Sequence, residues 1–154
     1  MIYKMGSNMG AAYQQDFYTW TLEQTSLLKQ KRFDELDLEH IIEEMEDMGK
    51  SEKRALESYI ENLLMHLLKW KYQPYYIGRR SWELTIIEQR KRLKWHIKEN
   101  PGLKSKLPEA IERSYELAKL GAEKETGIPI SRYPETCPWT YQQFTDSEFW
   151  PEAF

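Results

Sequence analysis

Arg90 is the side chain whose place in the sequence most directly raises a question of chemistry. On a helix with about 100° between residues it falls about 40° from Ile86, inside an apolar stripe that continues to Ile97. A guanidinium stays charged there, and burying it without a partner is costly. We therefore expect a carboxylate or carbonyl partner, with Glu44 as the first candidate and Asp47 as the second. The pair is either a structural ion pair between two helices or an anion-binding arginine in a cleft.

Four residues, Glu44, His66, Arg90 and His96, are together the candidates for catalysis. Arg90 and His96 have five residues between them, and small helical ribonucleases of the HEPN type carry an Arg-x(4–6)-His pair. In such a pair the histidine transfers protons and the arginine stabilises a phosphorane-like transition state. Charged helices often produce this spacing, however, and the two side chains project about 120° apart on a helical wheel. His66 lies at the margin of an apolar stripe, where a histidine is either hydrogen-bonded to a neighbour or a ligand or general base.

An acidic run precedes the most hydrophobic part of the chain. It comprises Glu39, Glu43, Glu44, Glu46 and Asp47. Two carboxylates that face an interior near His66 could bind a metal ion, but the Glu-x-x-His spacing of di-iron bundles is absent. A solvated helix surface explains the run, and we expect no metal site.

A basic stretch from Arg79 to Lys98 supplies the candidates for binding. They are Arg79, Arg80, Trp82, Arg92 and Trp95. Arginine and tryptophan side chains placed together can follow a phosphate backbone and stack on bases. The same charges can equally face the acidic run or water, and the formal net charge of −3 favours this second interpretation. Nucleic-acid binding is therefore possible but disfavoured.

Several established types of site are absent from the sequence. It contains no P-loop, dinucleotide-binding glycine turn, Ser/His/Asp order or zinc-binding Cys/His set, and we expect no cofactor. Its single cysteine, Cys137, cannot form an internal disulfide and is better explained as a small, half-buried residue than as a nucleophile. No apolar run approaches the roughly 18 residues of a membrane span, and the N-terminus lacks a signal pattern. The default location is therefore the cytoplasm, while residues 1–12 are expected to be a flexible leader with an open choice of start codon.

The segment from Ser51 to Gln73 is the element around which we expect the chain to be organised. It contains no proline or glycine, and its apolar residues recur every three or four positions: Leu56, Tyr59, Ile60, Leu63, Leu64, Leu67, Leu68 and Trp70. These positions cover roughly half of a helical wheel, which is wider than one partner helix can cover. We therefore predict a central helix with several helices packed against it.

The sequence predicts four further helices, over 14–30, 38–48, 82–99 and 109–126. We expect Gly49 to end the second, Ser51 and Ser81 to cap the helices that follow them, and Gly127 to close the last. Prolines prevent a long helix beyond Ile128, but seven aromatic residues argue against disorder there. The prediction is one all-α domain over 13–154, with a bundle of about five helices (13–127) and an aromatic-rich, irregular tail (128–154) packed on it.

Seven segments carry a resemblance to a known family. They are YQQDFYTWTLEQTSLL, FDELDLEHIIEEMEDMGKSEKRAL, LLMHLLKWKYQP, SWELTIIEQRKRL, ETGIP, PETCPWT and DSEFWPE. In this order they resemble the domain of unknown function 29 family, a group of small prokaryotic proteins common in cyanobacteria. The resemblance runs from Tyr13 to Glu152. It implies an all-α bundle and implies no activity.

Two hypotheses of function follow. The first is a cytosolic protein-binding or accessory module without catalytic activity, because aromatic residues are abundant at 14% and no catalytic group stands out. The alternative is a small helical phosphodiesterase or ribonuclease-like enzyme, in which Arg90 holds the phosphate while His66 or His96 moves protons. The first hypothesis requires an unknown protein partner, and neither fixes the oligomeric state.

Overall fold

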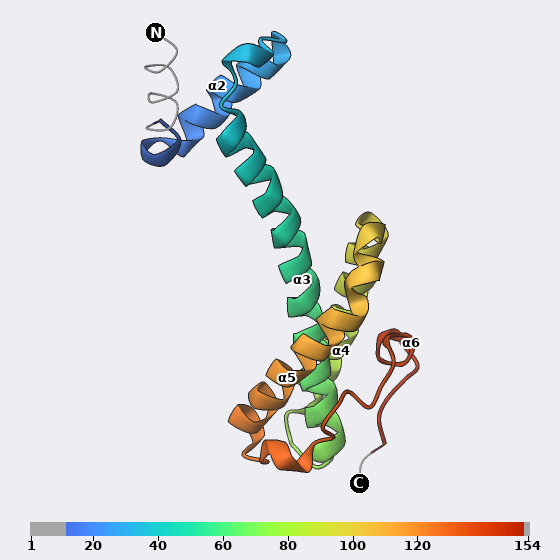
Figure 1. Cartoon of the computed structure of the whole chain (residues 1–154). Helices are drawn as coiled ribbons and strands as arrows, with labels where there is room; N and C mark the ends of the chain where they lie inside the picture. Colours follow the sequence, from blue (N-terminus) through green and yellow to red (C-terminus); the bar gives the residue numbers. More distant parts are fainter. Residues whose placement is uncertain (1–11, 153–154) are drawn as a thin grey trace. The chain divides into compact units, whose positions relative to one another are not determined.

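The computed structural model describes residues 12–152 and shows an all-α protein (Figure 1). Its α-helices are α2 (Phe17–Lys29), α3 (Leu38–Tyr72), α4 (Arg79–Glu99), α5 (Leu107–Thr126) and α6 (Tyr141–Thr145). Short 3-10 turns are formed by Phe33–Glu35, Pro101–Lys106 and Ile130–Arg132, and the described residues contain no strand. The predicted all-α class is therefore confirmed.

The chain divides into two compact units, Met1–Lys50 and Ser51–Phe154, which we call the N-terminal and C-terminal units. The expected single domain over 13–154 stays a prediction. The expected leader, residues 1–12, lies outside the described residues except for Ala12, which is helical.

The predicted break at Gly49 is wrong. Helix α3 runs through Gly49 without a positive φ angle, so the segments 38–48 and 51–73 form one helix and Ser51 is not a cap. A glycine inside a helix costs about 1 kcal/mol relative to alanine, which weakens a helix without ending it. The predicted stop at Gly127 is confirmed, because this residue closes α5 with a φ of 77°.

Three predicted helix starts shift by a few residues. The predicted helix 14–30 is interrupted at Asp16: residues 12–15 form a short helical turn, and α2 begins at Phe17, where the Asp16 carboxylate accepts a hydrogen bond from the Thr19 N–H at 3.0 Å and caps the helix. Helix α4 begins at Arg79, so Ser81 lies in its first turn instead of capping it. Helix α5 begins at Leu107, one residue before Pro108.

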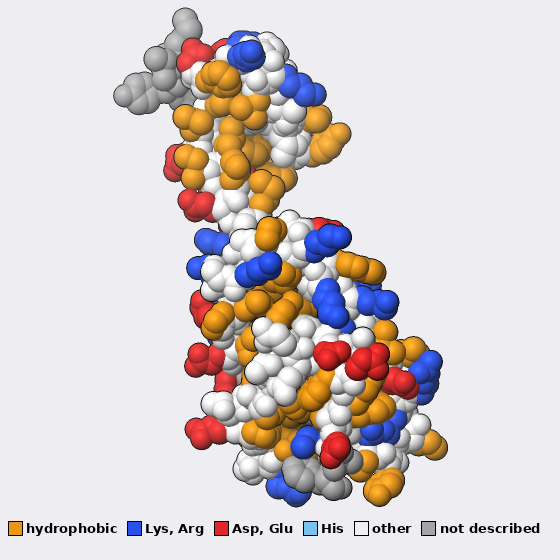
Figure 2. All heavy atoms as spheres, turned by 90° about the vertical axis from the view of Figure 1, so that its right-hand side faces the viewer, with side chains coloured by type: hydrophobic (Ala, Val, Ile, Leu, Met, Phe, Trp, Pro, Cys, Tyr) orange, Lys and Arg blue, Asp and Glu red, His pale blue; other side chains and the backbone are white. Residues whose placement is uncertain are grey.

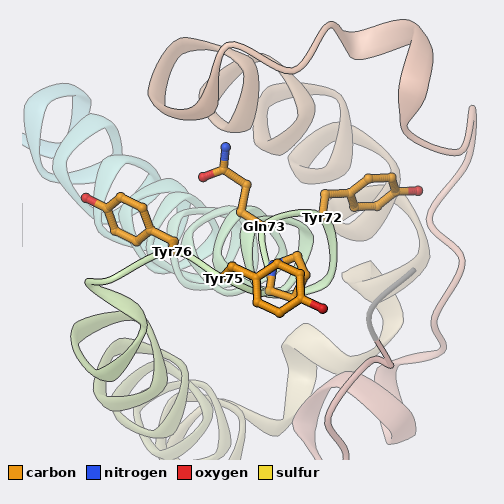
Figure 3. A pocket seen from close by; sticks show the side chains of 5 residues that line it. Tyr72, Gln73, Tyr75 and Tyr76 are labelled. Carbon is orange, nitrogen blue, oxygen red and sulfur yellow. The ribbon is translucent and has the colours of Figure 1, made fainter.

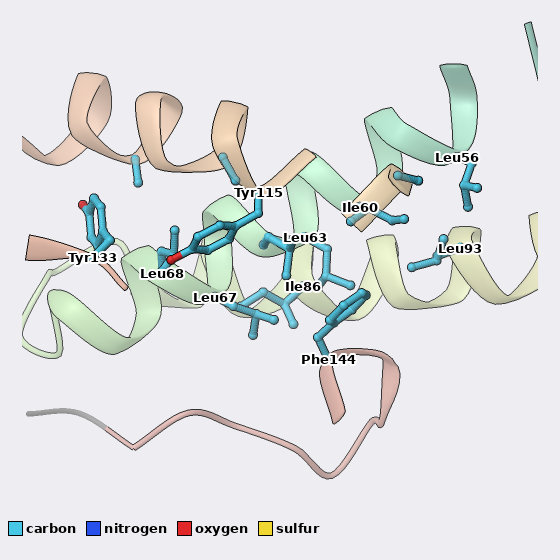
Figure 4. Close-up of a cluster of buried hydrophobic side chains, with 14 of the residues drawn as sticks. Leu56, Ile60, Leu63, Leu67, Leu68, Ile86, Leu93, Tyr115, Tyr133 and Phe144 are labelled. Atoms are coloured by element: carbon cyan, nitrogen blue, oxygen red, sulfur yellow. The ribbon is translucent and has the colours of Figure 1, made fainter. Parts of the chain in front are cut away.

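The core of the C-terminal unit surrounds the second half of α3. Leu56, Ile60, Leu63, Leu64, Leu67 and Leu68 are fully buried, as the predicted central helix requires. They pack against residues of α4 and α5, with Tyr115 entering from α5 and Phe144 from α6 (Figure 4). Full burial of such side chains stabilises a fold by about 1.5–3 kcal/mol each.

The tail lies against this core, as predicted. Thr140 begins α6 with a capping box, in which its hydroxyl and the side chain of Gln143 each bond the other residue's backbone N–H. Phe144 is fully buried, and Tyr133 is 4% exposed. The Tyr115 hydroxyl donates a hydrogen bond to the Pro134 carbonyl at 2.6 Å, which fixes the tail to α5.

The N-terminal unit is held together by a small polar and aromatic cluster. Trp20 of α2 is buried, and its Nε1–H donates to the Asp37 carboxylate at 3.0 Å. The Asp37 N–H donates to Gln24 Oε1 at 2.8 Å, and His40 Nδ1 lies 2.7 Å from the same carboxylate. The ring of Tyr13 stacks on His40 with centroids 4.0 Å apart.

Candidate functional site

Arg90 of α4 is 3% exposed and binds the backbone of the tail. Its Nε–H donates to the Phe144 carbonyl at 2.9 Å, and its Nη2–H donates to the Phe149 carbonyl. Phe144 lies in the last turn of α6, where carbonyl groups have no partner within the helix. The expected carbonyl type of partner is confirmed, but these carbonyls take the place that we assigned to Glu44.

Arg90 also lines a pocket of about 310 Å³. The pocket is lined by Ile87, Arg90, Lys91, Lys94, Trp95 and Ser147. Arg90 Nη1 is buried and has no hydrogen-bond partner in the described structure. Burial lowers the pKa of Arg90, and the charge of Asp146 opposes that shift.

Each candidate histidine uses one ring nitrogen to bind a backbone carbonyl. His96 is 8% exposed, and its Nε2 lies 2.8 Å from the Glu52 carbonyl oxygen. His66 Nδ1 lies 2.8 Å from the Asn62 carbonyl oxygen. Because a carbonyl only accepts hydrogen bonds, each of these nitrogens must carry the proton. Among the described residues, no hydrogen bond or ion pair joins either histidine to Arg90.

Burial lowers the pKa of His66, and the nearby charge of Lys69 adds to the shift, while its hydrogen bond to the Asn62 carbonyl opposes it. The neutral imidazole is therefore the stable form in the folded protein at neutral pH. This behaviour is typical of a histidine that packs at the rim of a core.

Glu44, the remaining catalytic candidate, lies in the N-terminal unit and accepts a hydrogen bond from the Tyr13 hydroxyl. This hydrogen bond is the main reason why the pKa of Tyr13 rises to about 12. Glu44 thus helps to hold the segment before α2 against α3. Its contacts within the unit are structural.

Comparison with known proteins identifies the family. The family model described as "Domain of unknown function DUF29" matches residues 12–150. The chain belongs to the DUF29 family. No curated protein and no solved structure matches it. The resemblance found in the sequence is thereby confirmed, and membership of DUF29 assigns no activity to the site.

Two of the predicted binding residues of this DUF29 chain serve the connection between α3 and α4. Arg79 Nη1 donates to the Trp70 carbonyl at 2.7 Å and to the Gln73 carbonyl at 2.9 Å, so it closes the C-terminal end of α3. Trp82 is 8% exposed, and its ring stacks on Tyr76 with centroids 4.4 Å apart. Both side chains are therefore occupied by internal contacts.

The other three binding candidates face solvent. Arg80 pairs with Glu83 at 2.9 Å and Arg92 with Glu88 at 2.8 Å, each within α4. Trp95 is 59% exposed and lines the pocket next to Arg90. Of the five predicted binding residues, Trp95 is the one that shares this pocket.

Sequence reasoning did not predict that Ser147 lines the same pocket as Lys91 and Lys94 of α4. Lys91 and Lys94 were visible as members of the basic stretch, but their spacing did not separate them from the other cations. Ser147 lies in the tail and reaches α4 because Arg90 binds the carbonyls on both sides of it. No sequence signal marks that contact.

Two other hollows of the DUF29 chain offer less chemistry. One, of about 320 Å³, is lined by Tyr72, Gln73, Pro74, Tyr75 and Tyr76. Figure 3 shows its labelled side chains pointing in different directions, with no common centre. The other, of about 460 Å³, includes Cys137, whose thiol donates to the Trp139 carbonyl and whose pKa burial raises. A protonated, hydrogen-bonded thiol is a poor nucleophile.

Residues 12–152 also lack two further kinds of site. No group of three or more His, Cys, Asp and Glu side chains there is arranged to hold a metal ion. No helix in the same range combines the length and the apolar composition that a membrane crossing requires.

Proposed function

We propose that this DUF29 protein is a cytosolic, non-catalytic module that binds a basic, amphipathic helix of another protein. The proposed contact surface, which we call the α3 face, comprises Leu38, Ile42, Met45 and Met48. Each of these side chains is 54–63% exposed. This exposed surface is the observation that carries the proposal.

The α3 face has the pattern of a helix that packs against another helix. Its residues recur at intervals of three and four, so they lie along one side of α3. Phe17, Tyr18, Leu22 and Leu28 of α2 in the same unit are also exposed. Figure 2 shows hydrophobic side chains at the surface of this unit. Contiguous exposed apolar side chains of this size are typical of interaction sites.

The charge around the α3 face selects the kind of partner. Glu39, Glu43 and Glu46 follow one border of the face on a helical wheel. Residues 1–50 contain ten Asp and Glu against five Lys and Arg, a formal charge of −5. A basic amphipathic helix matches both the apolar stripe and its acidic border. A second copy of this chain would instead bring two acidic borders together.

The contacts of the catalytic candidates also favour binding over catalysis. Arg90 donates hydrogen bonds to two tail carbonyls, and His66 and His96 each donate a hydrogen bond to a carbonyl. A phosphodiesterase would need one of these histidines beside the phosphate that Arg90 holds. The alternative enzymatic function therefore gains no support from these contacts.

Synthetic peptides provide the test. A helical peptide with leucine on one face and lysine on the other is titrated against the full chain by fluorescence anisotropy, beside a peptide in which glutamate replaces lysine. We expect the lysine peptide to bind and the glutamate peptide to bind at least about tenfold more weakly. Equal affinities would contradict the assigned partner class.

A matched pair of variants locates the binding. The double variant Ile42→Gln/Met45→Gln removes two residues of the α3 face without changing charge, whereas Leu117→Gln/Leu120→Gln removes two similarly spaced, exposed leucines of α5. The first variant should lower the affinity for the lysine peptide at least about tenfold, and the second should lower it by less than about twofold. Equal effects would refute the α3 face. Sedimentation of the wild-type chain tests whether a second copy of the chain occupies the α3 face. Dimers that form in the wild type and are lost in Ile42→Gln/Met45→Gln would also refute the proposal.

A further inference from the structure

The pocket beside Arg90 combines features that the proposed protein-binding function does not use. It lies between α4 and the tail in the C-terminal unit, away from the α3 face in sequence. Three cationic side chains line it: Arg90, Lys91 and Lys94. An exposed indole, Trp95, and a hydroxyl, Ser147, complete the polar part of its wall.

The buried part of the pocket wall holds an unused donor. Arg90 is 3% exposed and is held in place by two carbonyl acceptors. These bonds use Nε and Nη2 and leave Nη1 without a partner in the described structure. The guanidinium also lies over the Trp150 ring, with its central carbon 5.0 Å from the ring centroid, so it places a fixed positive charge in the pocket wall.

The surrounding charges favour an anion. The side chains of Lys91 and Lys94 are exposed, and both lie on the same side of α4 as Arg90. Asp146 is the acidic group that acts on Arg90, and its carboxylate already accepts a hydrogen bond from the Glu148 N–H at 2.9 Å. Three cationic groups against one carboxylate leave the site positive.

We propose that this pocket binds a small molecule that carries a phosphate group and a flat aromatic ring, as a nucleoside monophosphate does. Lys91 and Lys94 bind the phosphate oxygens, the fixed charge of Arg90 in the pocket wall attracts them, and the Ser147 hydroxyl donates a further hydrogen bond. Trp95 offers its face to the ring. The volume of about 310 Å³ is at the lower end of ligand sites, which favours a small ligand over a strand of nucleic acid.

Three probes test the ligand class: AMP, adenosine and inorganic phosphate, each titrated against the full chain by calorimetry. We expect AMP to bind most tightly, phosphate more weakly, and adenosine at least about tenfold more weakly than AMP. Adenosine binding as tightly as AMP would refute the phosphate site. An eight-residue oligoadenylate that binds at least about tenfold more tightly than AMP would refute the small-ligand class.

Two charge-matched double variants test the location. Lys91→Gln/Lys94→Gln removes two pocket lysines, and Lys98→Gln/Lys104→Gln removes two exposed lysines outside it. We expect the first double variant to lower the affinity for AMP at least about tenfold. The second should lower it by less than about twofold, because distant surface charges are screened. Equal losses in both would show general attraction of anions and refute the site.

A further variant separates the ring from the phosphate. Trp95→Leu should lower the affinity for AMP and leave the affinity for inorganic phosphate unchanged. An unchanged affinity for AMP would refute stacking on Trp95. All of these substitutions lie at exposed positions, so the contacts between Arg90 and the tail carbonyls remain intact.

Discussion

The two units of this chain distribute their hydrophobic residues in opposite ways. In the described part of the C-terminal unit, the apolar face of α3 is sealed by α4, α5 and the tail. In the described part of the N-terminal unit, Trp20 is the one fully buried hydrophobic residue, while nine large hydrophobic residues are exposed. One unit thus has a core that can support its fold, and the other leaves most of its large hydrophobic residues exposed.

The contrast is clearest within α3, because both of its halves carry apolar residues at helical spacing. Leu64 is fully buried, whereas Met45 is 63% exposed. The same pattern in one helix therefore gives a core in one place and an exposed surface in another. Neighbouring elements, not the pattern itself, decide between the two.

The largest effect is expected from truncating the core half of α3. Leu64→Ala should lower the free energy of unfolding by about 3 kcal/mol, because it removes buried methyl groups and leaves a cavity. Met45→Ala should lower it by less than about 0.5 kcal/mol. Urea denaturation followed by tryptophan fluorescence measures both. Similar losses in the two variants would contradict the proposed difference between the halves.

The next effect concerns the connection between α4 and the tail. Arg90→Ala should lower the free energy of unfolding by about 3 kcal/mol, because two tail carbonyls, one of them fully buried, lose their donors and a void remains. Arg90→Met should be milder by about 1 kcal/mol, because methionine fills most of that void. Thermal melts of both variants decide the point. Equal losses would show that the space around Arg90 collapses freely.

Residues 51–127 show how much of the fold the sequence determines. A half-circumference apolar stripe needs several partners to bury it, so the central helix and its neighbours were predictable. Gly127 was predictable as a helix end because α5 needs a residue that tolerates positive φ there. The continuation of α3 through Gly49 was not predictable, because a glycine inside a helix carries only a small free-energy penalty, which tertiary context overrides.

The candidate site was predictable only in part. Arg90 was identified because an arginine within an apolar stripe must find a partner. Its partners are backbone carbonyls of Phe144 and Phe149, which every sequence possesses and which no side-chain pattern marks. The exposure of the α3 face was missed for a related reason, since periodicity shows that a stripe is apolar but not what covers it.

A smaller and local effect is expected in the N-terminal unit. Trp20→Phe removes the indole N–H that binds the Asp37 carboxylate and should destabilise this unit by about 1–2 kcal/mol. Hydrogen exchange of amides in α2 should accelerate, while that of amides in α5 should not change. Equal acceleration in both helices would mean that the two units unfold together.

Two helix caps compare the units directly. Thr140→Ala and Asp16→Ala each remove a side chain that accepts a hydrogen bond at the start of a helix. Thr140→Ala should lower the free energy of unfolding by about 1 kcal/mol, because α6 carries the buried Phe144. Asp16→Ala should instead increase exchange in α2 with less than about 0.5 kcal/mol of global loss. The reverse order in urea denaturation would count against the comparison.

The smallest effect is expected from the titration of His66, which lies on α3 in the C-terminal unit. Burial places the folded-state pKa of this histidine below its ordinary value of 6.5. Below pH 6.5 the unfolded chain therefore binds the proton more readily than the folded chain does, so protonation favours unfolding. Stability should fall as the pH drops from 6.5 toward the folded-state pKa and should level off below it.

His66→Gln, which cannot be protonated, should lose less stability over the same range. If the difference between the wild type and this variant were independent of pH, burial of the imidazole would not perturb its titration. Since His66 belongs to the C-terminal unit, the wild-type loss should also speed amide exchange in α5 more than in α2.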